Sequence, residues 1–295
     1  MPVALVASAS NLQAAAYKEL SLGSIAPKGW LLDQLTLQAQ GLGGHLAQFW
    51  PDVMQSVWVG GAADKGLHER TPYWLNGIVP LAFLLRAAGA STKLKPVSGV
   101  YLAAAPDATT PPGAPPLRPV DVMAQARRYV DYVLSHQAPS GWLGPNASGG
   151  DQYWGPSNVL LALTQFASAS RDDPPLYRNI SSAIQSHLLE QRRRLKTTPL
   201  AGWSYHRWMD QALSALWLLD NAPLDRETSA ELLDLLNILR AQGVDREAFF
   251  EKLRANGTSP RMSDEMLHNV NVAQGIKSAA VIARFNATAG MSMAE

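Results

Sequence analysis

Apolar side chains recur at helical spacing along most of the chain. In the segment 120–136, Val122, Ala126, Tyr129 and Val133 fall on one face of a helix. The segment 75–88 is apolar nearly all round, which predicts a helix that is buried on most sides. Further helices are predicted over 30–40, 158–169, 176–195, 207–219, 228–241 and 245–254, and a last one from 263 to about 285.

Strand signals are nearly missing, because no run of alternating Val, Ile and Thr occurs. The segment 41–44 (GLGG) is expected to end the first helix. The segment 103–119 (AAAPDATTPPGAPPLRP) predicts an exposed loop. We expect residues 1–20 to form an N-terminal extension and residues 21–295 to form a single all-α domain. Helices that alternate with Gly-, Pro- and Trp-rich loops build either solenoids or closed α/α toroids.

The composition limits the classes of function. Of the 295 residues, 47% are hydrophobic and 17% are charged, which favours a large core over disorder. The net charge of +1 argues against nucleic acid as a partner and against electrostatic attraction to a membrane. The chain contains no cysteine, which excludes disulfides, thiolate nucleophiles and Cys-ligated zinc within it. No nucleotide-binding or metal-binding motif occurs either, so we expect no cofactor.

Two features bear on location. The most apolar stretch, 75–90, is too short to span a membrane and carries polar residues. Sequons for N-glycosylation begin at Asn146, Asn179, Asn256 and Asn286. These four sequons favour an extracellular or secretory location, and coincidence is the alternative.

Tryptophan is unusually frequent, with nine residues that gather at junctions of loops and helices beside Gly, Pro and polar residues. Aromatic faces stack on the C–H faces of sugar rings, while polar neighbours bond the hydroxyls. These junctions predict a carbohydrate cleft. The aromatic candidates for sugar binding are Trp58, Tyr73, Trp74, Trp142 and Trp154. The alternative is that tryptophan only packs the core of a helical interaction scaffold.

Candidate acids lie near these aromatic residues. A glycosidase needs two carboxyls, or one acid and another nucleophile, beside the bond that it cleaves. Glu69 and Asp151 are the best candidates by context, although a buried pair with arginine for Glu69 and an Asx-turn for Asp151 are alternatives. In the segment 267–271 (LHNVN), one helix turn carries a histidine and two amides. This polar wall adds His268 and Asn271 to the predicted sugar-binding residues.

Several segments resemble, in the same order, the β-L-arabinofuranosidase-like glycoside hydrolases of family 127 and its relatives. They are 22–31 (LGSIAPKGWL), 34–45 (QLTLQAQGLGGH), 70–77 (RTPYWLNG), 136–145 (HQAPSGWLGP) and 268–274 (HNVNVAQ). The resemblance implies an (α/α)6 barrel followed by β-rich modules, and hydrolysis of terminal sugars, typically arabinofuranosides of cell-wall glycans. It also implies pocket histidines at His206 and His268, a sugar contact at Asp151, and cleft positions for Trp74 and Trp142.

The chain departs from this family in its catalytic residues. The family's acid/base Glu, zinc ligands and nucleophilic Cys follow the segment that matches His268, and this chain holds no Cys and stops at Glu295. The resemblance therefore implies an incomplete toroid. Three explanations compete: a truncated chain whose missing C-terminal half or homo-oligomer partner would cover apolar faces, a divergent hydrolase, or a carbohydrate-binding remnant without catalysis. A polysaccharide lyase is a further alternative, with a histidine base, a tyrosine and an arginine that neutralises the uronate.

Overall fold

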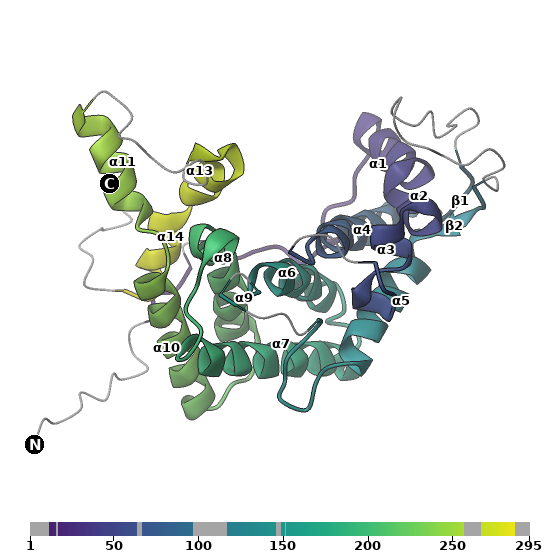
Figure 1. Cartoon of the computed structure of the whole chain (residues 1–295). Helices are drawn as coiled ribbons and strands as arrows, with labels where there is room; N and C mark the ends of the chain where they lie inside the picture. Colours follow the sequence, from purple (N-terminus) through teal and green to yellow (C-terminus); the bar gives the residue numbers. More distant parts are fainter. Residues whose placement is uncertain are drawn as a thin grey trace, which may run out of the picture.

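The structure is a computed structural model that describes residues 12–15, 17–63, 67–96, 117–145, 149–150, 152–256 and 267–286. These residues are mostly helical, which confirms the predicted all-α class (Figure 1). The longer helices are α1 (Trp30–Gln40), α2 (Leu42–Phe49), α4 (Arg70–Ala87), α5 (Val122–Ser135), α6 (Trp154–Ser168), α7 (Pro174–Leu195), α9 (Trp208–Asn221), α10 (Arg226–Gln242) and α11 (Arg246–Asn256). The shorter elements are α3 (Pro51–Met54), η2 (Val57–Val59), α8 (Gly202–His206), α13 (Asn269–Gly275), α14 (Ser278–Ala283), β1 (Lys93–Leu94) and β2 (Val120–Asp121).

Three helical hairpins form two layers. In the first layer, α4 packs against α6, and α6 packs against α9. In the second layer, α5 lies against α4, α7 against α6 and α10 against α9. Each hairpin therefore contributes one helix to each layer. Figure 1 shows α1 to α3 and the strands at one end of this array, and α11, α13 and α14 at the other end.

The first layer holds most of the core. Nearly all residues of α6 are buried, since α4, α7 and α9 enclose this helix. The second-layer helix α10 instead buries one stripe, formed by Leu232, Leu235, Leu236 and Leu239 at positions i, i+3, i+4 and i+7. The all-round apolar pattern and the amphipathic pattern of the sequence thus correspond to the first and second layers.

The two layers also differ at the N-terminal ends of their helices. Each second-layer helix is capped by an aspartate, Asp121, Asp173 or Asp225, whose carboxylate accepts hydrogen bonds from N–H groups of the first turn. The first-layer helices α4, α6 and α9 have no such side-chain cap. Their N-terminal ends therefore keep the partial positive charge of an uncapped first turn.

The segment 41–44 ends the first helix as predicted, because α1 ends at Gln40 and Gly41 is its C-cap residue. The helix that follows at once was not predicted. Helix α2 begins at Leu42, directly after α1, and includes Gly43 and Gly44. The carbonyl oxygens of these glycines accept hydrogen bonds from Trp74 Nε1 (2.8 Å) and Gln125 Nε2 (2.9 Å). Contacts with α4 and α5 thus stabilise a helix that glycine by itself disfavours.

The last predicted helix, 263–285, is wrong as a single element. Residues 267–286 form two short helices, α13 and α14, with a turn at 276–277, while 263–266 lie outside the described residues. The turn brings Lys277 to Asp210 of α9, with which it forms an ion pair. Gly275 lies so close to Arg246 of α11 that a Cβ atom there would be 2.9 Å from Arg246 Cδ. Contacts with α9 and α11 therefore decide where the helix breaks.

The remaining connections add two details. The predicted loop 103–119, of which the structure describes 117–119, is followed by an unpredicted antiparallel pair of β2 with β1. In the predicted N-terminal extension, Gln13 exchanges hydrogen bonds of 2.8 and 2.7 Å with Arg284, just after α14. Within the described ranges, no helix is both long and apolar enough to cross a membrane.

Candidate functional site

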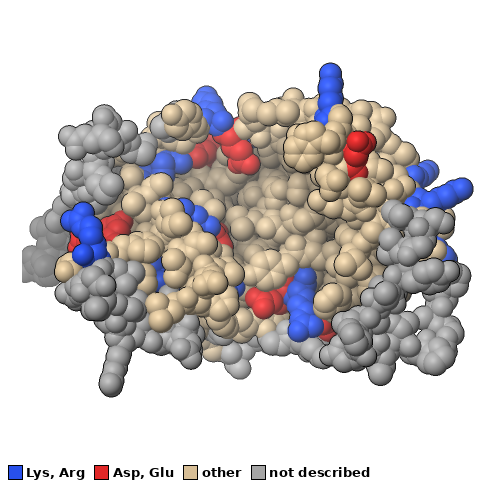
Figure 2. Space-filling model, turned by 90° about the horizontal axis from the view of Figure 1, so that it is seen from above, with Lys and Arg blue, Asp and Glu red and all other residues tan. Residues whose placement is uncertain are grey.

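The N-terminal ends of α4, α6 and α9 meet on one face of the molecule. Figure 1 places α8 and α13 on one side of the upper face and α1 to α3 on the other. Figure 2 looks down on this face and shows a hollow across its middle, with most of the charged side chains in view around its edges.

Arg207, directly before α9, is the centre of a polar and aromatic cluster. Its Nε donates to Asn271 Oδ1 (2.7 Å), and a terminal nitrogen donates to the Tyr73 hydroxyl (3.1 Å). The guanidinium carbon lies 4.5 Å from the ring centroids of both Trp154 and Trp203, within the range of cation–π interactions. These contacts compensate the burial of the charge. We define the Arg207 cluster as Glu69, Tyr73, Trp154, Trp203, Arg207, His268 and Asn271.

Glu69 enters this cluster from a constrained turn. It occupies the N-cap position of α4, and its Oε2 accepts a hydrogen bond from Trp154 Nε1 (2.6 Å). The preceding His68 has a φ of 54°, the only positive φ at a non-glycine position among the described residues. A left-handed residue of this kind costs about 1 to 2 kcal/mol. Trp58 Nε1 stabilises the turn by donating to the His68 carbonyl (2.7 Å), so packing determines where Glu69 points.

Tyr73 forms the exposed edge of the cluster, with 44% of its surface exposed. Burial of the rest of its ring raises the pKa of the Tyr73 hydroxyl; the Arg207 guanidinium opposes this rise, and the charges of Glu69 and Asp210 add to it. The hydroxyl therefore keeps its proton at neutral pH. It accepts a hydrogen bond from Arg207, and no described residue accepts its own proton. Because Tyr73 is partly exposed, that proton is available to a ligand that binds from solvent.

Helix α13 and its N-cap residue contribute His268 and Asn271 to the Arg207 cluster. His268, at its N-cap position, is exposed and meets the Trp203 ring edge to face, with ring centroids 5.0 Å apart. Asn271, one turn further, is fully buried against Arg207. The predicted polar wall therefore has one residue that faces solvent and one that holds the arginine.

A second acid near Tyr73 is already engaged. Asp210 Oδ2 accepts a hydrogen bond from Gln274 Nε2 (2.6 Å), and Lys277 pairs with the other oxygen. Glu69, by contrast, is half-buried and has one carboxylate oxygen without a partner among the described residues. No three His, Asp or Glu side chains in the described ranges are grouped so that they could hold a metal ion.

Five predicted site residues are brought together in the Arg207 cluster, namely Glu69, Tyr73, Trp154, His268 and Asn271. Within this group, Trp154 is fully buried. Its Nε1 donates to Glu69 and its ring contacts the Arg207 guanidinium, so Trp154 supports both side chains and has no surface left for a ligand.

Other predicted site residues lie elsewhere. Trp58, Trp74 and Trp142 are only 2%, 7% and 1% exposed, so their rings pack the interior. This corrects the prediction that they contact a sugar directly. His206 is buried beside Tyr205, one residue away from the central arginine. Asp151 lies outside the described residues.

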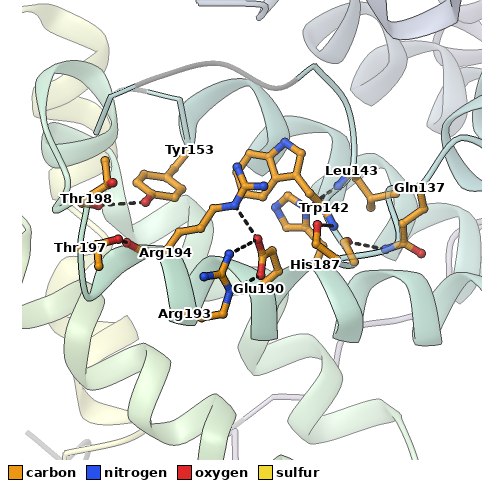
Figure 3. Close-up of polar contacts among 12 residues, drawn as sticks. Gln137, Trp142, Leu143, Tyr153, His187, Glu190, Arg193, Arg194, Thr197 and Thr198 are labelled. Carbon is orange, nitrogen blue, oxygen red and sulfur yellow. Dashed lines mark hydrogen bonds and ion pairs between the residues drawn. The ribbon is translucent and has the colours of Figure 1, made fainter.

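A second cluster of similar composition supports the loop that leads into α6 (Figure 3). We define the His187 cluster as Trp142, Tyr153, His187, Glu190 and Arg194. The Arg194 guanidinium lies 4.0 Å from the centroid of the Trp142 ring. Glu190 accepts hydrogen bonds of 2.7 Å from Arg193 and Arg194.

His187 connects this cluster to the loop. Its Nδ1 accepts a hydrogen bond from the backbone N–H of Leu143 (2.9 Å), which requires a neutral ring. Burial lowers the pKa of His187 to about 3; the Arg194 charge adds to this shift, and the Glu190 charge opposes it. The ring is therefore neutral at physiological pH, and it holds the loop against α7.

The sequence interpretation missed Arg207 as the centre of the site, and it missed Trp203. The available signal was the segment 203–208 (WSYHRW), in which an arginine stands between two tryptophans. A cation placed among aromatic rings indicates cation–π stacking. The interpretation chose the adjacent histidine instead.

Comparisons of the chain with models of protein families, with curated proteins and with solved structures find no match. The resemblance to family 127 hydrolases therefore stays a prediction, and the functional argument rests on the residues of the site.

Proposed function

We propose that this protein is a glycoside hydrolase-like protein that binds the terminal sugar of a cell-wall glycan over the Arg207 cluster. The observation that supports this most is that Tyr73 and Trp203 contact the Arg207 guanidinium, while Glu69 bonds Trp154, which lies against the same guanidinium. Tyr73 and Trp203 supply aromatic surface, while the Tyr73 hydroxyl, the Glu69 carboxylate and His268 supply groups that bond sugar hydroxyls. A sugar site needs both kinds of group in one cleft. The sequence resemblance favours an arabinofuranoside.

Glu69 is the residue that we propose to act on the glycosidic bond. Trp154 holds one of its oxygens and leaves the other without a described partner. The uncapped N-terminal ends of α4 and α6 lie beside this carboxylate and favour negative charge. Because hydrolysis uses a second acid or nucleophile, we propose Asp151, three residues before α6, for that role.

Carbohydrate binding without hydrolysis is the second candidate. It is favoured by Asp210, the second described acid of the region, whose oxygens bond Gln274 and Lys277. The lyase alternative has less support. It needs an arginine that can neutralise a uronate, and Arg207 is already engaged by Asn271 and Tyr73.

The scaffold alternative accounts for part of the structure. Six of the nine tryptophans are buried, as a helical scaffold predicts. Trp30, Trp50 and Trp203 are not buried, and a scaffold gives no reason for an arginine held between aromatic rings at a hollow.

Turnover tests this proposal. The purified chain is assayed with a panel of aryl-glycosides that includes arabinofuranosides, and sugar binding is measured in parallel. We expect Glu69→Gln and Asp151→Asn to abolish product release while binding persists. Glu231→Gln is the control, because Glu231 pairs with Arg192 on the second-layer helices α10 and α7. Binding without turnover in the unmodified chain supports the binding-only candidate, and no binding of any sugar overturns both.

We further propose that the two layers belong to an α/α toroid. Support comes from the three consecutive hairpins, each with one helix in each layer. On α13 and around it, Leu267, Val270 and Ile276 are exposed, which a further hairpin or a second copy of the chain would cover. Sedimentation over a range of concentrations tests the second copy. If association occurs, Ile276→Glu is expected to weaken it.

A secretory location is the remaining proposal. Asn179 is exposed on α7, so the glycan-acceptor side chain of its sequon is accessible in the folded chain. Expression through a secretory pathway should yield a chain whose electrophoretic mobility increases after endoglycosidase treatment. Asn179→Gln is expected to remove one step of that shift. A chain of unmodified mass would contradict the proposal.

A further inference from the structure

A fixed aromatic ring stands beside α3, on the other side of the molecule from α8 and α13 (Figure 1). Trp50, between α2 and α3, is 41% exposed. Its Nε1 donates to Asp52 Oδ2 (3.1 Å), and Arg70 pairs with the same oxygen. The Arg70 guanidinium also lies 5.9 Å from the centroid of the Trp50 ring. An exposed indole that is already held by its neighbours loses little conformational freedom when a ligand stacks on it.

This ring is linked to the Arg207 cluster along α4. Arg70 and Tyr73 are three residues apart in the first turn, so they lie on the same face of the helix. Both side chains are partly exposed. Arg70 contacts Trp50, and Tyr73 contacts Arg207, so the shared face of α4 aligns these four residues. This line of residues leads from α3 toward α8 and α13, the two sides of the upper face in Figure 1.

A small polar pocket lies beside the Arg70–Asp52 pair. It is lined by Asp52, Ser56, His68, Arg70 and Thr71, together with apolar neighbours that include Trp58. Its volume of about 10 Å³ is the size that accommodates one water molecule. A single hydroxyl group would fit the same space, and the lining offers it donors and acceptors.

The charges along this line are balanced. Asp52 pairs with Arg70, and Asp210 pairs with Lys277. Glu69 and Arg207 act with opposite signs on Tyr73, and both contact Trp154. Among these described residues, the three cations Arg70, Arg207 and Lys277 are matched in number by the carboxylates Asp52, Glu69 and Asp210, which favours an uncharged ligand over a polyuronate.

We propose that Trp50, Asp52 and Arg70 form a second sugar-binding subsite, which binds the inner units of a neutral oligosaccharide. The terminal sugar of the same chain lies over the Arg207 cluster, so this inference rests on the proposed function. The Trp50 ring stacks on one sugar face, and the pocket beside Arg70 receives one hydroxyl.

Titration calorimetry with neutral arabino-, xylo- and cello-oligosaccharides of one to four units tests the subsite. Glu69→Gln is used as the background, so that turnover does not change the ligands. For the sugar type that binds, we expect affinity to rise about tenfold from the monosaccharide to the trisaccharide. Trp50→Ala should remove most of that rise, and Trp50→Phe should retain part of it because a ring remains.

Matched controls separate the subsite from general surface effects. Tyr17→Ala removes an aromatic ring that is 90% exposed and lies outside the line. Arg127→Met breaks an Arg–Asp pair whose arginine is as exposed as Arg70, at 48% against 47%. We expect both controls to keep the rise with chain length, whereas Arg70→Met reduces it. Thermal unfolding of each variant checks that the fold is kept.

The outcomes distinguish the two proposals. If sugars bind in a Tyr73-dependent way but affinity does not rise with length, or rises equally in Trp50→Ala, the subsite is overturned and the proposed function stands. If oligogalacturonides bind more tightly than the neutral series, the neutral class is overturned. If none of the sugars binds, the proposed function fails and the subsite with it.

Discussion

The Arg207 cluster and the His187 cluster are built from the same residue types but stand in different surroundings. Each contains an arginine over a tryptophan ring, together with a glutamate, a histidine and a tyrosine. In the His187 cluster, Trp142 and Tyr153 are both 1% exposed. In the Arg207 cluster, Tyr73 and His268 reach solvent. Similar junctions of loop and helix therefore serve as core in one place and as a candidate site in another.

The two clusters differ most in their unused hydrogen-bonding groups. Tyr153 donates to the Thr198 carbonyl (2.9 Å), and burial raises the pKa of Tyr153 to about 12. In that cluster, His187 Nε2 is the atom left without a partner, and it is sealed from solvent. In the Arg207 cluster, by contrast, the Tyr73 hydroxyl proton and one Glu69 carboxylate oxygen have no partner among the described residues. These accessible, unused hydrogen-bonding groups distinguish the region that can bind a ligand, whereas the residue types are the same in both clusters.

One tryptophan of each cluster, Trp142 or Trp203, can be removed in turn. Trp142→Ala is expected to lower the free energy of unfolding by about 3 to 5 kcal/mol, because it leaves a cavity in the core. Trp203→Ala should cost about 1 kcal/mol, since the ring is only half-buried. Urea unfolding followed by circular dichroism measures both. Equal losses would mean that the two clusters are equally part of the core.

We expect the His187 cluster to make the free energy of unfolding depend on pH. Because the pKa of His187 is lowered from 6.5 to about 3, the unfolded chain binds more protons in that interval. The stability that His187 contributes is therefore complete above about pH 6.5 and is lost as the pH falls, by up to about 1.4 kcal/mol per pH unit. His187→Gln should flatten this part of the curve of unfolding free energy against pH.

Of the two clusters, only the Arg207 cluster should affect ligand affinity. Trp203→Ala is expected to weaken binding of a sugar about tenfold, because it removes stacking surface. Trp217→Phe, which changes a buried ring of α9 that contacts Tyr177, serves as the control. Titration calorimetry on folded variants measures the effect. A similar loss in the control would assign the weakening to a disturbed α9.

The smallest effect is expected for single hydroxyl groups. Tyr73→Phe should weaken sugar binding about two- to fivefold and change stability by less than about 0.5 kcal/mol. Tyr177→Phe is the matched control: Arg171 lies over its ring, and its hydroxyl donates to the Asn221 carbonyl (2.6 Å). It should cost about 1 kcal/mol of stability and no affinity. Affinity loss in both variants, or in neither, would remove the distinction between the two tyrosines.

The local spacing of apolar residues was sufficient to predict the bounds of a helix where the end residues of that helix also favour its start or stop. The helix predicted over 30–40 is α1 with the same bounds, and the amphipathic segments 176–195 and 228–241 correspond to α7 and α10 within two residues. These elements carry apolar stripes and Asp or Gly residues at their ends. The pattern predicted the end of α1 but missed α2, which includes Gly43 and Gly44, and it missed the turn at 276–277. At both places, contacts from other helices outweigh the local preference.

The candidate site was harder to predict for a related reason. The aromatic junctions were recognised, and Glu69, Tyr73, His268 and Asn271 do meet around one arginine. Local pattern could not show that Arg207, and not its neighbour His206, is the residue between the rings. That choice depends on the turn between α8 and α9, which places adjacent side chains in different surroundings.

The sequence by itself determined the helical class, the positions of the long helices and the concentration of aromatic residues at junctions of loops and helices, because these follow from spacing and composition along the chain. Only the tertiary structure decided which tryptophans are covered and which face the hollow. Trp142 and Trp203 both follow a glycine at a loop–helix junction. Trp142 is buried against His187 of α7, whereas Trp203 of α8 is only half-buried against His268, the N-cap residue of α13. Burial is a property of what lies opposite a residue, and that partner is distant in the sequence.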